Sequence, residues 1–187
     1  MKPLNFFLAC YVFVVTLSSC SERSRIAREF AEFTNKTIVL PSSFHKVISG
    51  KLMVESEVDS GLPVMIMYND SLACSLCQIN HLYERTPIYE LSDSLGTFSV
   101  MTILSPMEEE YGEVVEGLIE RDLDFPVYID HSGDFRRLNS FIPEDTRFHC
   151  FLMDKTGKPI FVGDPVSSTA LWDLFTQVLD SIRDSGQ

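Results

Sequence analysis

The sequence predicts an α/β fold with a central, mostly parallel sheet, flanking helices and an antiparallel hairpin near the carboxyl end. Two observations lead to this prediction. From residue 63 onward, apolar runs of strand length alternate with amphipathic stretches of helix length, and such alternation is typical of parallel strands joined by helices. Two later runs, 147–154 and 159–163, are separated only by a short turn at 155–158, which indicates a hairpin.

The first twenty residues are predicted to be a targeting segment. Lys2 is the only charged residue before position 20, and the run 4–17 is mostly apolar. That run is too short for a comfortable transmembrane helix and fits the apolar region of a secretory signal. It ends in Leu-Ser-Ser-Cys at Cys20, which resembles the lipobox of bacterial lipoproteins. The resemblance implies removal of residues 1–19 and lipidation of Cys20; an ordinary signal peptide or an uncleaved anchor is the alternative.

The next part of the chain predicts a helix and then three strands. In residues 21–35, the apolar residues Ile26, Phe30 and Phe33 recur at helical spacing, which predicts a short amphipathic helix. This helix is expected either to pack on the domain or to tether it to the membrane. Two short strands are expected, around Thr37–Leu40 and Lys51–Glu55, with turn residues between them. The run 63–69 is continuously apolar, which indicates a buried strand.

The remaining elements complete the alternation. A helix begins at Cys74 and is expected to kink or break at Pro87. The closing helix over 167–182 is capped by Ser167, Ser168 or Thr169, and one side of it carries Leu171, Leu174, Phe175, Val178 and Leu179. Between these, strands are predicted at 97–105, 126–130, 147–154 and 159–163, and helices at 107–121 and 134–141.

The charge of the chain argues against nucleic-acid binding. The formal net charge is −12. Without the targeting segment, 14 basic and 27 acidic residues remain, a net charge of −13. Such a surface repels phosphate backbones, and the sequence has no basic cluster that would reverse this. We therefore expect no nucleic acid among the partners.

Three cysteines remain after the targeting segment. Cys10 would leave with the signal peptide and Cys20 would carry lipid, which leaves Cys74, Cys77 and Cys150 in a compartment where disulfides persist. Cys74 and Cys77 follow a buried strand and open a helix. A helix start favours the thiolate, and two intervening residues put the second sulfur within reach of the first. The spacing therefore predicts a redox pair, with a static disulfide or two buried thiols as alternatives.

The order of elements, the CxxC after a buried strand, and the segment 151–160 (FLMDKTGKPI) resemble thioredoxin-like proteins. The membrane-anchored TlpA-like reductases, like the peroxiredoxins, add one strand and one helix to that fold. The resemblance covers about residues 46–184. It implies a thiol–disulfide oxidoreductase with Cys74 as nucleophile and Cys77 as resolving thiol, without a bound cofactor. Its partners would be protein thiol or disulfide substrates and a protein that donates or accepts electrons.

The expected organisation follows from these two resemblances. Residues 1–19 are a lipoprotein signal peptide, 20–45 a lipidated tether with the N-terminal helix, and 46–187 the thioredoxin-like domain. The protein would be anchored by lipid to a bacterial membrane on an extracytoplasmic side, periplasmic or outer-membrane.

Three positions depart from the thioredoxin pattern. Residues 70–73, just before Cys74, include no aromatic side chain. Six residues before Cys74, Tyr68 stands where many thioredoxins have a buried Asp. Phe148 stands where the family has a cis-proline that helps to bind the substrate backbone. Since a non-proline cis bond costs about 2.5–4 kcal/mol, Phe148 is expected to be trans and substrate docking to differ. A redox-inactive binding module with CxxC as a structural disulfide therefore stays open.

Other chemistry has weaker support. Cys150 is either an accessory thiol near the site or a small buried core residue, and the second interpretation is favoured. Cys74, Cys77 and His149 could in principle form a soft copper site, but their spacing matches copper-delivery proteins poorly. We therefore expect no metal. The residues before Cys74 also lack the Thr and Pro typical of thiol peroxidases.

Overall fold

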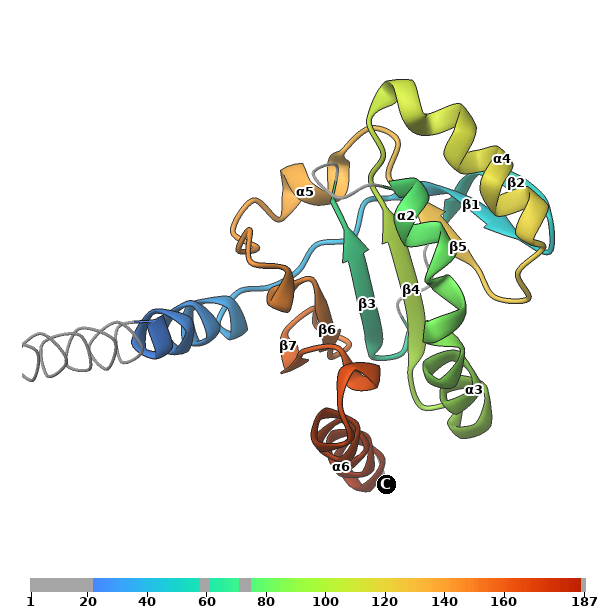
Figure 1. Ribbon diagram of the computed structural model, residues 1–187. Coiled ribbons are helices and arrows are strands. Elements are labelled where there is room, and N and C mark those ends of the chain that lie inside the picture. Colours follow the sequence, from blue (N-terminus) through green and yellow to red (C-terminus); the bar gives the residue numbers. More distant parts are fainter. Residues whose placement is uncertain (1–21, 58–60, 71–74, 186–187) are drawn as a thin grey trace, which may run out of the picture.

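The structure is a computed structural model that describes residues 22–57, 61–70 and 75–185. Within these residues a seven-stranded sheet has the order β2-β1-β5-β4-β3-β6-β7 (Figure 1). The strands are β1 (Ser43–Ile48), β2 (Lys51–Glu57), β3 (Val64–Asn69), β4 (Ser99–Leu104), β5 (Val127–Ile129), β6 (Cys150–Met153) and β7 (Pro159–Val162).

Helices flank this sheet. Residues 22–34 form the first helix, and it is followed by α2 (Ser75–Asn80), α3 (Thr86–Leu95), α4 (Tyr111–Arg121), α5 (Asp134–Leu138) and α6 (Thr169–Ser185). Four short 3-10 turns connect the elements: η1 (Leu82–Arg85), η2 (Glu108–Glu110), η3 (Thr146–Phe148) and η4 (Pro165–Ser167). None of the helices in the described ranges is long and apolar enough to cross a membrane.

The predicted α/β fold class is confirmed. The three central strands β3, β4 and β5 are parallel, and β6 and β7 form the expected antiparallel hairpin against β3. On the other side, β1 runs antiparallel to both β5 and β2, so the sheet as a whole is mixed. Along the chain, the elements from β3 to α6 follow one another in the order that the thioredoxin-like resemblance implies, with α4 and β5 between β4 and β6.

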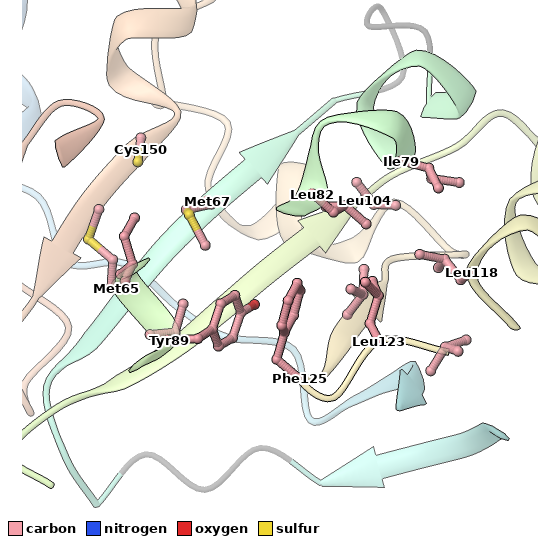
Figure 2. Close-up of a cluster of buried hydrophobic side chains, with 14 of the residues drawn as sticks. Met65, Met67, Ile79, Leu82, Tyr89, Leu104, Leu118, Leu123, Phe125 and Cys150 are labelled. Carbon is pink, nitrogen blue, oxygen red and sulfur yellow. The ribbon is translucent and has the colours of Figure 1, made fainter. Parts of the chain in front are cut away.

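Both faces of the central sheet are buried. Along β3, Met65 and Met67 enter one apolar cluster, whereas Ile66 and Tyr68 enter the other, because successive side chains of a strand point to opposite faces. Figure 2 shows the first cluster, where both methionines share a layer with residues of the helical segment such as Tyr89. Two buried faces explain why β3 is a continuous apolar run rather than an alternating one.

One predicted strand is wrong. Residues Thr37–Leu40 form no strand, because their backbone groups bond elsewhere. The Ile38 N–H donates to the carbonyl of Gly157 over 2.8 Å, and the Asn139 side-chain amide bonds both the N–H and the carbonyl of Val39. The strand lies later, at β1, and the predicted turn at Ser49-Gly50 joins it to β2, with both residues at positive φ (47° and 64°).

The break in the long central helix also lies elsewhere than expected. α2 ends at Asn80, the 3-10 turn η1 follows, and α3 begins at Thr86. Pro87 is thus in the first turn of α3, where the N–H that proline lacks would have no intrahelical acceptor. Proline begins the second helix here instead of interrupting the first.

The closing helix agrees with its prediction except on one side chain. The Ser168 hydroxyl accepts the N–H of Leu171 over 3.3 Å, one of the three predicted caps. Phe175 and Leu179 are buried, but Leu174 is 48% exposed. The predicted apolar face was therefore too wide at Leu174.

The helix 22–34 packs on the sheet through its last turn. Phe33 is 1% exposed and its ring meets those of Phe148 and Phe151 edge-on, with centroids 5.8 and 5.2 Å apart. The helix was expected either to pack on the domain or to tether it to a membrane. Its carboxyl-terminal turn packs on the domain.

Candidate functional site

The predicted redox segment follows the central strand β3. Cys77 is the third residue of α2, its side chain is exposed, and it takes part in a disulfide. Cys74, Cys20 and Cys10 lie outside the described residues. The second cysteine therefore stands at a strand–helix junction, beyond the carboxyl end of a strand that is buried on both faces.

A groove of about 710 Å³ begins beside this helix. Gln78, which directly follows Cys77, and His81, one helical turn after Cys77, both line it. The structure brings Phe148 and Cys150, the two candidate accessory residues, into the lining of the same groove. Further lining residues come from the first helix, the sheet and the segment before α6: Ile26, Phe30, Met67, Val162, Asp164 and Leu171.

Phe148 belongs to a closed turn instead of a proline loop. No cis peptide bond occurs among the residues that the structure describes, so Phe148 is trans, as predicted. Its N–H donates to the carbonyl of Asp145 over 2.9 Å, and the His149 N–H donates to that of Thr146. The Asp145 carboxylate accepts the Arg147 N–H. The N–H groups of residues 147–149 are thus used within the turn, and a substrate backbone would have to bond elsewhere.

Cys150 is poorly suited to nucleophilic attack. Its side chain is buried at the start of β6. Burial raises the pKa of its thiol far above the usual value, and the negative charge of Asp164 acts in the same direction. Since the thiolate is the reactive form, this thiol stays protonated and unreactive at neutral pH. The physical environment is that of a core cysteine.

An ion pair lies in the groove lining together with Cys150. The guanidinium of Arg85, in η1, bonds the carboxylate of Asp164, which precedes η4, and both side chains are about one-quarter exposed. Asp164 also accepts the N–H of Val166 and so begins η4. The pair ties the helical segment that follows Cys77 to the end of β7.

A buried polar network behind the groove was not predicted from the sequence. The Tyr68 hydroxyl bonds Ser105, and the Ser105 hydroxyl donates to the Asp130 carboxylate over 3.1 Å. Asp130 also accepts the N–H groups of Asp134 and Phe135 and thereby begins α5. Burial raises the pKa of both Tyr68 and Asp130.

The network lies at the carboxyl ends of the parallel strands. Tyr68 is near the end of β3, and Ser105 and Asp130 directly follow β4 and β5. The carboxyl ends of three neighbouring parallel strands are thus linked at one edge of the sheet. The sequence held a signal for these residues, since each polar residue ends an apolar run. It held no signal for which strands are neighbours in the sheet.

The histidines near the site have other partners. His149 is buried, and its Nε2 lies 2.9 Å from the carbonyl oxygen of Pro143. His81 is exposed, and its Nδ1 lies 2.7 Å from the Glu84 carboxylate. Within the described parts of the chain, no three His, Cys, Asp or Glu side chains gather as metal ligands.

Two histidines for which the sequence predicted no role, His45 and His131, lie side by side near the start of α4. His45 Nδ1 lies 2.6 Å from the Tyr111 hydroxyl, and the ring of His131 stacks on His45 with centroids 5.5 Å apart. The cluster joins β1 to the start of α4 and so has a structural role.

Comparison with known proteins found two solved structures of distant similarity. The chain is similar to a thioredoxin-like protein solved in solution in its oxidized form, with 18% identity over 78% of this chain and 95% of that one, at a TM-score of 0.48. It is also similar to an uncharacterized thioredoxin-like protein from Porphyromonas gingivalis, with 20% identity, 82% and 97% coverage and a TM-score of 0.45. No protein-family model and no curated protein matches the sequence. What the structure itself gives is a mixed α/β sheet in which α2 follows β3, the order of elements that the thioredoxin-like resemblance implies.

Proposed function

We propose that the protein is an extracytoplasmic thiol–disulfide oxidoreductase that acts on protein disulfides through Cys74 and Cys77. The observation that carries this proposal is the disulfide at Cys77, which is exposed on a short helix next to an open groove. Exposed disulfides are the ones open to attack by a thiolate and are more often labile or catalytic than buried structural ones.

The exchange reaction needs only the two sulfurs. In the reduced protein the Cys74 thiolate attacks one sulfur of the substrate disulfide, forms a mixed disulfide and releases the other sulfur as a thiol. The Cys77 thiolate then attacks the Cys74 sulfur and releases the second substrate thiol. Two electrons and two protons pass to the substrate, and the protein is left with a Cys74–Cys77 disulfide. The reverse sequence oxidises a dithiol substrate.

The location proposed for this chemistry is the outer side of a bacterial membrane, with lipid on Cys20 after removal of residues 1–19. Disulfides persist in such compartments. A partner protein that supplies or removes electrons returns the pair to its starting state, and no bound cofactor takes part.

A second candidate function is a binding module whose disulfide is structural. The closed turn at Phe148 favours it, because the N–H groups of residues 147–149 are bonded internally and so are withdrawn from a substrate backbone. The two functions differ in the redox stability of the disulfide.

The reduction potential of the pair separates them. The full chain is equilibrated in glutathione buffers, free thiols are trapped, and the protein is digested with trypsin. Residues 52–85 form a tryptic peptide that contains Cys74 and Cys77 and no other cysteine, so its mass reports the pair alone. A reversible transition between about −270 and −120 mV supports an oxidoreductase, whereas a disulfide that stays closed below about −300 mV assigns a structural bridge and the binding module.

A further inference from the structure

One wall of the groove comes from a helix that precedes the central sheet. Ile26 and Phe30 of helix 22–34 line the groove, Ile26 half-buried and Phe30 46% exposed. Phe33, on the same face three residues after Phe30, is buried against Phe148 and Phe151. This anchor holds Phe30 at the groove, opposite the turn that carries Phe148.

Several apolar side chains line the groove. Phe148 packs in the same cluster as Phe33 of the helix, whereas Met67 of β3 and Leu171 of α6 belong to the cluster on the other face of the sheet. The N–H groups of the turn at 147–149 are bonded within the turn. A chain segment that enters the groove would therefore be recognised through its side chains more than through its backbone.

The charges around the groove do not favour an acidic or basic ligand. Each of the two arginines in the lining is paired with an aspartate, Arg85 with Asp164 and Arg147 with Asp145. Their charges are thus largely compensated within the protein. The remaining attraction of this part of the groove is its apolar surface, which contacts with another apolar side chain would remove from water.

We propose that helix 22–34 is a specificity element of the redox site. Ile26 and Phe30 form an apolar subsite that receives a large apolar side chain flanking the disulfide of a protein substrate. The inference rests on the proposed function and names its substrate class, because the groove lining includes Gln78, the residue next to Cys77. The occupant is an extended segment of a substrate protein, and continuity of the groove with α2 is the reason for that choice.

Single-turnover reduction of three disulfides tests the inference. The reduced full chain is mixed with hydroxyethyl disulfide and with two peptides that share one cyclic disulfide and differ in a single flanking residue, phenylalanine or serine. We expect the phenylalanine peptide to react at least about tenfold faster, since an apolar pocket discriminates by about 10- to 200-fold for one methylene group. Phe30→Ala and Ile26→Ala should each lower this preference severalfold.

Leu174→Ala is the matched control. Leu174 is 48% exposed, a fraction similar to the 46% of Phe30. Because Leu174 is not part of the groove lining, this variant should keep the wild-type preference. Equal rates for the two peptides, or a preference that survives both Phe30→Ala and Ile26→Ala, would overturn the inference. So would a dimer that Phe30→Ala dissociates without changing the preference, because a second copy would then occupy the groove.

The two proposals fail in different ways. The oxidoreductase itself is refuted if reduced wild-type protein reduces none of the three disulfides and oxidised wild-type protein oxidises none of the corresponding dithiols. Wild-type protein that reduces all three without preference leaves the oxidoreductase standing and removes the subsite.

Discussion

Truncation of Phe33 tests whether the N-terminal helix is part of the packed structure. Phe33 is 1% exposed, and three aromatic rings surround it, with centroids 5.2, 5.8 and 6.4 Å away at Phe151, Phe148 and Phe141. Removing a buried phenylalanine side chain costs about 3–5 kcal/mol, and each aromatic pair adds about 0.5–1.5 kcal/mol beyond buried area. We expect Phe33→Ala to lower the free energy of unfolding by about 4 kcal/mol.

Phe30→Ala provides the comparison on the same helix. Phe30 is half-exposed, so the same change in composition and helix propensity removes far less buried surface, and we expect a loss of about 1 kcal/mol or less. The difference between the two variants, about 3 kcal/mol, isolates the burial of Phe33 from the general cost of replacing phenylalanine by alanine.

Urea unfolding followed by tryptophan fluorescence measures both losses. Trp172 is the sole tryptophan and packs near Phe175 on the opposite face of the sheet from Phe33. Its signal therefore reports unfolding of the whole domain and not a local change at the helix. The midpoints are compared at an unchanged denaturant dependence. If Phe33→Ala costs no more than Phe30→Ala, the helix is not docked and the groove has no wall on that side.

Two further predictions concern a turn and an ion pair. Alanine at Gly157 would require a left-handed φ of 84° and a Cβ 2.5 Å from the Ile38 carbonyl oxygen, so Gly157→Ala should cost more than about 2 kcal/mol. Gly96→Ala, left-handed but in open space, should cost about 1 kcal/mol; equal losses in thermal unfolding would contradict the clash. The hydrogen bond from Arg147 holds the pKa of Asp145 below its usual value, so this carboxylate stabilises the fold above about pH 4 and the contribution is lost as the pH falls through the lowered pKa. Asp145→Asn should therefore lose less stability than wild type between about pH 5 and pH 2, and parallel pH profiles would refute this.

The sheet and its helices were largely predictable because their signals are local. The continuous apolar run at β3 reflects burial on both faces, and the short turn at 155–158 identifies the β6–β7 hairpin on its own. The hairpin of β1 and β2 was not predicted, because the strand before it was placed at Thr37–Leu40. The strand before the CxxC segment and the helix after it were predictable for the same reason, whereas the redox role of Cys74 and Cys77 stays a prediction. The trans peptide at Phe148 likewise follows from residue type.

The two errors in element placement have different causes. Thr37–Leu40 resembles a strand in composition, yet its backbone bonds Gly157 and Asn139, more than 90 positions away in the chain. Pro87 was taken as an interruption because its position relative to the helix start depends on where η1 divides the two helices. Neither arrangement has a local signature.

The sequence was sufficient for the order of elements, the redox spacing and the departures from the thioredoxin pattern. The tertiary structure was needed to assemble the site. It places Asp130 and Ser105 behind Tyr68, because strand order makes β3, β4 and β5 neighbours. It also turns a short amphipathic helix into a groove wall, because Phe33 finds its aromatic partners more than 100 residues later in the chain. Periodicity reports which face of an element is apolar, whereas the partner of that face is chosen by packing of the whole chain.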